Sequence, residues 1–173
     1  MRLTVRDLVE DDANSVLTLV GQVLAQAKTT VTAPEEFSFT EEQEREYLRK
    51  FQNNHDELAL GCLGDGYLLG VLFLEQISKL RTRHRASVGF SVLPSHWGQG
   101  IGTALMRALL ERLPSLKVVQ QVEASVLSNN PASERLLRSA GFHPIGVVPN
   151  AVQLGGAFLN ETLFVLRPGE AAD

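Results

Sequence analysis

The most constraining feature of the sequence is the segment from Ala86 to Leu113, in which an apolar run is followed by three glycines and then by a helical pattern. The run around Phe90 contains β-branched residues and ends at Pro94, as expected of a buried strand. From Thr103 onward, apolar residues recur with helical spacing. The segment therefore predicts a strand, a glycine turn and a helix, in that order.

The glycine turn gives this segment a chemical preference for an anion. Glycine lets the backbone approach a ligand closely and adopt positive φ angles. The first N–H groups of a helix have no partner within the helix, and the positive end of the helix dipole lies at the same place. A diphosphate is therefore the expected ligand, and the residues expected to hold it are Gln99, Gly100, Ile101, Gly102 and Thr103.

Two other nucleotide-binding motifs share this order of elements. A Rossmann fingerprint, G-x-G-x-x-G/A, needs a third small residue, but counting from Gly98 gives Thr103 and counting from Gly100 gives Leu105. Glu123 lies about 20 residues further on, where that fold places its ribose-binding acid. A Walker loop requires Gly-Lys-Ser/Thr, and the turn contains no lysine. The Walker loop is excluded, and the Rossmann motif stays an alternative.

The glycine turn resembles the pyrophosphate-binding segment of the GCN5-related N-acetyltransferases, the GNAT family, whose pattern is Q/R-x-x-G-x-G/A. Within WGQGIG, Gly100 and Gly102 stand at the two small positions, and Trp97 replaces the usual Gln or Arg. This replacement removes one side-chain contact and leaves the backbone cradle intact. The resemblance implies that acetyl-CoA is the cosubstrate and that the turn binds its diphosphate.

A second segment, SNNPASERLLRSAGF, resembles the downstream motif of the same family. Asn130 stands at the asparagine of that motif, Ser133 at its small residue, and Gly141 and Phe142 at its closing pair. Leu137 stands where the family has a tyrosine, which donates a proton to the departing sulfur. Two motifs in the right order, separated by one helix and one strand, identify the family more specifically than either motif alone.

The resemblance covers residues 2–166 and implies an α/β (α+β) fold, with a mixed, mostly antiparallel sheet and helices on both faces. Its central parallel strands, which end at Leu93 and Leu127, splay apart, and the pantetheine arm of acetyl-CoA lies in the gap. We expect a single acetyltransferase domain over residues 1–167 and a frayed tail over residues 168–173.

Strands that stop pairing leave backbone N–H and C=O groups that need other partners. An amide-bearing pantetheine supplies such partners. We therefore expect the backbone of Ser91, Val92 and Leu93 to contact pantetheine or the acetyl carbonyl, with one N–H polarising that carbonyl. Asn130 and Ser133 are expected to line the opposite wall of the gap.

Turn and capping signals predict the remaining elements. Two apolar runs joined by Gly64-Asp65-Gly66 predict a hairpin over residues 58–76. One helix is expected to begin at Asp11 or Asp12, and a second at Thr40, where a capping box begins. The loop over residues 29–39 between these helices resembles a lid over the acceptor site. Further strands are expected over residues 118–127, 145–148 and 158–166, and a further helix from residue 131 to residue 140.

The reaction implied by the resemblance is direct transfer of the acetyl group to a primary amine of a small molecule, with an amino acid or a related amine favoured. An alkylammonium ion, with a pKa of about 10.4, must lose a proton before it attacks the thioester. Glu123, beside the gap, and His84, which titrates near neutrality, are the expected catalytic residues. Glu35 and Glu36 on the loop are further options. The alternative interpretation of each of these four residues is an ordinary surface position without a catalytic role.

Other interpretations stay open at the level of sequence. Leu137 is compatible with a non-catalytic acyl-CoA sensor or interaction module, and a protein N-terminal or lysine acetyltransferase shares the motifs above. Arg81, Arg83 and Arg85 form either a solvated loop or a site for an acceptor carboxylate. Residues 152–164 form either internal core or the interface of a homodimer.

Composition narrows the expected partners. The chain of 173 residues has a net charge of -4, which does not suggest a nucleic-acid partner. No apolar run reaches the roughly 18 residues of a membrane helix and no signal peptide is visible, so a cytoplasmic protein without a membrane partner is expected. Cys62 is the only cysteine, so an internal disulfide is excluded, and a packing role is expected. No bound metal is expected.

Overall fold

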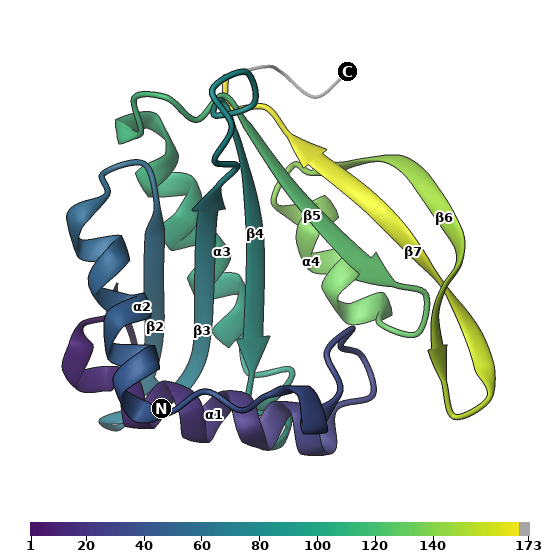
Figure 1. The fold of residues 1–173 in the computed structure, drawn as a ribbon, viewed down its shortest axis with the longest axis horizontal. Helices are drawn as coiled ribbons and strands as arrows, with labels where there is room; N and C mark the ends of the chain where they lie inside the picture. The colour runs from purple at the N-terminus through teal and green to yellow at the C-terminus, as the bar shows by residue number, and fades with distance from the viewer. Residues whose placement is uncertain (170–173) are drawn as a thin grey trace.

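The computed structural model describes residues 1–169 of the chain (Figure 1). In this part, seven strands form one sheet in the order β1-β2-β3-β4-β5-β7-β6. All neighbouring strands are antiparallel except β4 and β5, which are parallel. The strands are β1 (Leu3–Asp7), β2 (Leu58–Gly64), β3 (Tyr67–Gln76), β4 (Arg85–Val92), β5 (Gln121–Leu127), β6 (His143–Leu154) and β7 (Ala157–Leu166). The predicted mixed, mostly antiparallel sheet is confirmed.

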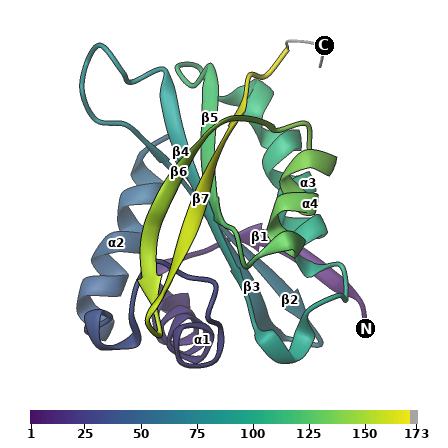
Figure 2. The same ribbon diagram turned by 90° about the vertical axis from the view of Figure 1, so that its right-hand side faces the viewer.

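Helices cover both faces of the sheet, as predicted. Figure 2 shows α1 and α2 on one side and α3 and α4 on the other. Each pair closes its own hydrophobic cluster against the strands. The helices are α1 (Ala13–Gln26), α2 (Glu41–Asn53), α3 (Ile101–Arg112) and α4 (Pro131–Ser139), and the short 3-10 turns are η1 (Glu10–Asp12), η2 (Pro34–Glu36), η3 (Pro94–His96) and η4 (Leu113–Ser115).

Capping side chains fix where two of the helices begin. The N–H of Gln43 donates to the hydroxyl of Thr40 and the N–H of Thr40 donates to the side chain of Gln43, which is the predicted capping box of α2. Asn130 caps α4 by accepting from the N–H of Ser133 at 3.1 Å. At α1 the cap differs from the prediction, because the carboxylate of Asp12 is engaged by Arg6 and by the N–H of Val9.

The two parallel strands separate after three residue pairs. Pairing of β4 with β5 runs from Arg85 opposite Gln121 to Ser87 opposite Glu123. Beyond this point β4 stays paired with β3 and β5 stays paired with β7, so the facing edges of β4 and β5 diverge (Figure 1). The splay predicted from the sequence is confirmed, and it opens toward the glycine turn at the end of β4.

Some predicted bounds are wrong. β5 begins at Gln121 rather than at residue 118, because the N–H of Val118 donates to Asp56 and the N–H of Gln120 donates to the carbonyl of His84. β6 is longer than the predicted 145–148, since irregular pairing with β7 carries it to Leu154. Of the predicted tail, residues 168 and 169 form a turn, and residues 170–173 lie outside the described residues.

Candidate active site

The glycine turn leads directly into α3. Gly100 is the N-cap of this helix, with φ 82° and ψ 4°, a left-handed conformation that glycine adopts without steric cost. The first hydrogen bond of the helix is the one that the N–H of Ala104 donates to the carbonyl of Gly100, at 2.9 Å. The N–H groups of residues 101–103 come before it in the chain and point out of the positive end of the helix. A Cβ built at Gly98 or Gly100 would meet no heavy atom within 4 Å, so the space before the turn is open.

A cavity of about 420 Å³ lies at this helix end, and we call it the helix-end cavity. Its walls come from the end of β4, the glycine turn, the N-terminal parts of α3 and α4, and Val23, Ala27, Thr29 and Thr30. The predicted cofactor residues that line it are Ser91, Val92, Gly100, Ile101, Gly102, Thr103, Asn130 and Ser133.

Two predicted cofactor residues do not line the helix-end cavity. The backbone N–H of Leu93 donates to the carbonyl of Leu69 at 3.0 Å, and the Leu93 side chain packs against both hydrophobic clusters. The side-chain amide of Gln99 reaches back to the carbonyl of Ser95 at 3.5 Å. Because neither residue lines the cavity, we do not assign them a ligand contact.

Trp97 forms part of the cavity wall in place of the family's Gln or Arg. Its indole N–H donates to the carbonyl of Val92 at 2.8 Å, and the residue is 52 % exposed. The indole therefore satisfies a backbone carbonyl at the very end of β4. A ligand lying along this strand has to use the backbone groups that precede this carbonyl.

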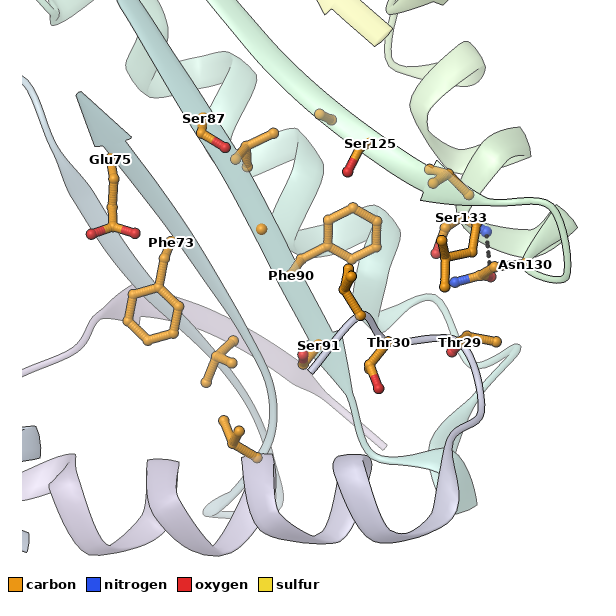
Figure 3. Close-up of a pocket in the computed structure, with 18 of the residues that line it drawn as sticks. Thr29, Thr30, Phe73, Glu75, Ser87, Phe90, Ser91, Ser125, Asn130 and Ser133 are labelled. Atoms are coloured by element: carbon orange, nitrogen blue, oxygen red, sulfur yellow. Dashed lines mark hydrogen bonds between the residues drawn. The ribbon is translucent and has the colours of Figure 1, made fainter. Parts of the chain in front are cut away.

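A second cavity, of about 600 Å³, lies in the splay itself, and we call it the sheet cavity. Residues 87–91 of β4 and residues 124–127 of β5 line it, and residues of α1, α2 and the loop over residues 29–39 line it as well. Figure 3 shows Phe90 and Ser125 facing the space between the two strands. The two cavities share six lining residues, which are Thr29, Thr30, Phe90, Ser91, Asn130 and Ser133. They therefore meet at the mouth of the splay.

The sheet cavity is acidic, and the rest of its lining combines apolar side chains with hydroxyl and amide groups such as those of Ser125 and Asn130. Glu44, Glu75 and Glu161 line it, and its described lining includes no Lys, Arg or His. Burial raises the pKa of Glu44 above its usual range. Burial, followed by the charge and hydrogen bond of Glu75, raises the pKa of Tyr47, whose phenol is therefore neutral. Such a lining favours a ligand with a positive charge and an apolar body.

The two residues expected to be catalytic lie outside both cavities. Glu123 stands in the paired part of β5, where Arg85 and Gln121 donate to its carboxylate. The hydrogen bonds from Arg85, the largest cause, hold the pKa of Glu123 below its usual range, which weakens it as a base. His84 is exposed in the turn before β4. We therefore do not assign proton transfer to either residue.

The other charged residues considered at the sequence level also stay away from the site. Arg85 is engaged by Glu123, and Arg81 and Arg83 are exposed in the turn before β4. Glu35 and Glu36 are exposed in η2, where the carboxylate of Glu36 accepts from the N–H of Ala33 at 2.7 Å. Residues on both sides of η2 do line the sheet cavity, and these are Thr29, Thr30, Val31, Phe37 and Phe39. The loop therefore lies over the cavity, while its acids point elsewhere.

The acids of the sheet cavity are functional candidates that the sequence reasoning missed. Glu44 was open to detection, because it shares the spacing of Leu48 and Phe51, which form the buried face of α2. A carboxylate on the apolar stripe of a helix needs an explanation. Glu75 and Glu161 gave no comparable signal, since their position depends on how the strands pair.

Comparisons with known proteins agree with this geometry. The family model for an acetyltransferase (GNAT) domain matches residues 2–143. The probable N-acetyltransferase YjcK of Bacillus subtilis is 31% identical over 134 residues, which is 76% of this chain and 70% of that protein. N-acetyltransferase aca1 of Schizosaccharomyces pombe is 33% identical over 89 residues, which is 51% of this chain and 43% of that protein.

Solved structures share the whole fold. A GNAT-family acetyltransferase from Streptococcus pneumoniae superimposes with a TM-score of 0.91 at 18% identity, covering 97% of this chain and 100% of that one. The putative acetyltransferase yncA of Salmonella typhimurium, solved with its cofactor acetyl-CoA, gives 0.86 at 20% identity, covering 99% and 96%. The chain belongs to the GNAT family, and it is an acetyl-CoA-dependent N-acetyltransferase.

Acetyl-CoA fits the residues that are present. The free edge of β4 offers backbone groups to an amide-bearing arm, and the open glycine turn offers helix N–H groups to a diphosphate. In residues 1–169 no group of three or more His, Cys, Asp or Glu is placed to hold a metal ion. Among the same residues no helix combines the length and apolar character needed to span a bilayer.

Proposed function

We propose that this enzyme acetylates the primary amine of a small molecule whose remaining body is apolar. The observation that carries the proposal is the sheet cavity, whose described lining includes three acids and many apolar side chains and which meets the helix-end cavity at the mouth of the splay. A cationic amine with an apolar body matches this lining. Amines without a carboxylate are favoured over amino acids, since the described lining offers no cation to a carboxylate.

The proposed pose of acetyl-CoA follows the two cavities. The diphosphate lies on the N–H groups of residues 100–103, and pantetheine runs along the free edge of β4 beside Ser91. Asn130 and Ser133 form the facing wall. The acetyl group then lies at the mouth of the splay, where a backbone N–H of β4 polarises its carbonyl.

The sulfur of CoA needs a different proton source from the usual tyrosine. Leu137 is fully buried in the core of the α3–α4 side, so its position is not available to the reaction. Tyr67 is exposed at the start of β3, and Tyr47 lines only the sheet cavity. Ser133 lines both cavities, and we assign to it the role of hydrogen-bond donor to the thiolate. A thiol with a pKa of about 8.5 needs little help to leave.

A thiol-release assay tests the proposed function. The purified enzyme is given acetyl-CoA and, in parallel, apolar monoamines, polyamines, aminoglycosides, amino acids and peptides with free N-termini. The proposal predicts saturable release of CoA with apolar monoamines and weaker turnover of the corresponding amino acids. Turnover confined to peptides identifies a protein acetyltransferase. If acetyl-CoA binds and every one of these acceptors fails, the proposed substrate class is wrong.

A further inference from the structure

Within residues 1–169, Glu44 differs from the other buried acid, Glu57, in having no positive partner. It lies on the inner face of α2, it is 5% exposed, and it lines the sheet cavity. The cations near it are engaged elsewhere: Arg45 bonds to Glu41 and Asp11, and Arg49 bonds to Glu10. In the described part of the chain, no Lys, Arg or His forms an ion pair with Glu44.

The neighbouring acid Glu75 is in a different electrostatic state. The ammonium group of Lys50 lies 3.3 Å from its carboxylate, and Tyr47 forms a hydrogen bond with it. Lys50 also lies 3.5 Å from buried Glu57. Glu75 thus has a cationic partner within the protein, which it shares with Glu57.

The remaining surroundings of Glu44 are mostly neutral. Glu161, from β7, is the third acid of the cavity, and it is only half-buried. From α1, the residues that face the cavity are Val16 and Val20, and the loop contributes threonines, a valine and phenylalanines. The titratable groups that line the cavity with Glu44 are therefore Tyr47, from the same helix, and Glu75 and Glu161, and none of them is a cation.

We propose that Glu44 is the general base, which pairs with the acceptor's ammonium group and removes its proton. This inference rests on the proposed function, since it requires a small amine in the sheet cavity. One proton passes from nitrogen to the Glu44 carboxylate, and the nitrogen then attacks the carbonyl carbon of the thioester. The C–N bond forms, and the C–S bond breaks with its electron pair going to sulfur. A second proton passes from the nitrogen to the sulfur and gives the thiol of CoA, and Glu44 returns its proton to solvent.

Burial suits Glu44 to this role. A carboxylate removed from water gains most from a cationic ligand, because their attraction is weakly screened there. The same burial raises the pKa of Glu44, which brings the base closer in proton affinity to the amine and makes it a better proton acceptor. Glu46, on the outer face of the same helix, is exposed, so water screens its charge.

The test is the pH dependence of kcat and KM in three variants. Glu44→Gln keeps the shape of the side chain, Glu44→Asp keeps the charge on a shorter chain, and Glu46→Gln removes an equal charge from the outer face of α2. Acetyl-CoA binding, measured by calorimetry, is the check of folding for each variant, because Glu44 does not line the helix-end cavity.

We expect Glu44→Gln to lower kcat by roughly 100- to 10,000-fold and to abolish the acid limb of the pH profile. Glu44→Asp should keep the limb at a reduced rate, and Glu46→Gln should match wild type. If Glu44→Gln raises only the KM of the amine, or keeps the wild-type limb, Glu44 is not the base, although the proposed function stands. If the wild-type enzyme acetylates no small amine, the proposed function itself fails.

Discussion

Replacing Gly100 by alanine separates backbone strain from ligand binding. Gly100 has φ +82°, and Gly156, in the β6–β7 turn, has φ +85°. A Cβ built at either position meets no heavy atom within 4 Å, so neither substitution causes a clash within the protein. Of Gly100 and Gly156, only Gly100 lines the helix-end cavity. Gly156→Ala is therefore a control with the same strain and no ligand contact.

The two substitutions should cost the same stability. A non-glycine residue in the left-handed region costs roughly 1–2 kcal/mol, and each kcal/mol lowers Tm by about 2–4 °C in a domain of this size. We therefore expect both variants to melt about 2–8 °C below wild type. In acetyl-CoA binding they should differ. At Gly100 the added methyl group enters the open space of the helix-end cavity, where the diphosphate is proposed to lie. Displacing the diphosphate weakens a charge-assisted hydrogen bond worth about 1.5–3 kcal/mol, or roughly a 10- to 150-fold loss in affinity.

Calorimetric titration with acetyl-CoA and thermal melting together measure both effects. Gly100→Ala should lose affinity while Gly156→Ala retains it, at equal Tm. Gly100→Asp should bind more weakly still, because its carboxylate faces the diphosphate. Equal affinities for the two alanine variants would refute the placement of the diphosphate at the glycine turn.

Three further predictions concern the residues around the site. Glu44→Gln should raise Tm at pH 8. Burial raises the pKa of Glu44, so the wild-type protein loses stability as the pH rises through that folded-state pKa, and the variant does not. The gain in Tm should vanish below about pH 4, and a lower Tm of the variant at pH 8 would contradict the prediction. Glu123→Gln should leave kcat/KM unchanged, and a collapse of kcat in the thiol-release assay would restore Glu123 as the base. The same substitution should lower the free energy of unfolding by about 1 kcal/mol or less at pH 7. This loss should fade as the pH falls below about 4, because Arg85 lowers the pKa of Glu123. Leu137→Tyr should lower stability by about 1–3 kcal/mol, since the side chain is fully buried, and faster turnover would show that the position reaches the sulfur.

The sequence predicted the centre of the fold because local chemistry specifies it. The glycines before α3, the capping box at Thr40 and the cap at Asn130 each act within a few residues. The hairpin of β2 and β3 follows from its glycine turn in the same way. β6 was underestimated, because most of its residues are exposed on both faces and show no alternation.

The proton-transfer site was harder to predict, since it depends on strand register. The sequence places Glu123 next to the splay, but only the pairing opposite Ser87 shows that it lies in the closed part. Glu75 reaches the cavity through the pairing of β3 with β4. Glu44 was predictable in principle, because its place on the apolar face of α2 depends only on helical spacing.

The most direct test of the account is a crystal structure of the complex with CoA. It should place both phosphorus atoms of the diphosphate against the backbone N–H groups of residues 100–103, with pantetheine along the free edge of β4. A diphosphate bound elsewhere, or a glycine turn covered by the indole of Trp97, would contradict the placement on which the proposed chemistry depends.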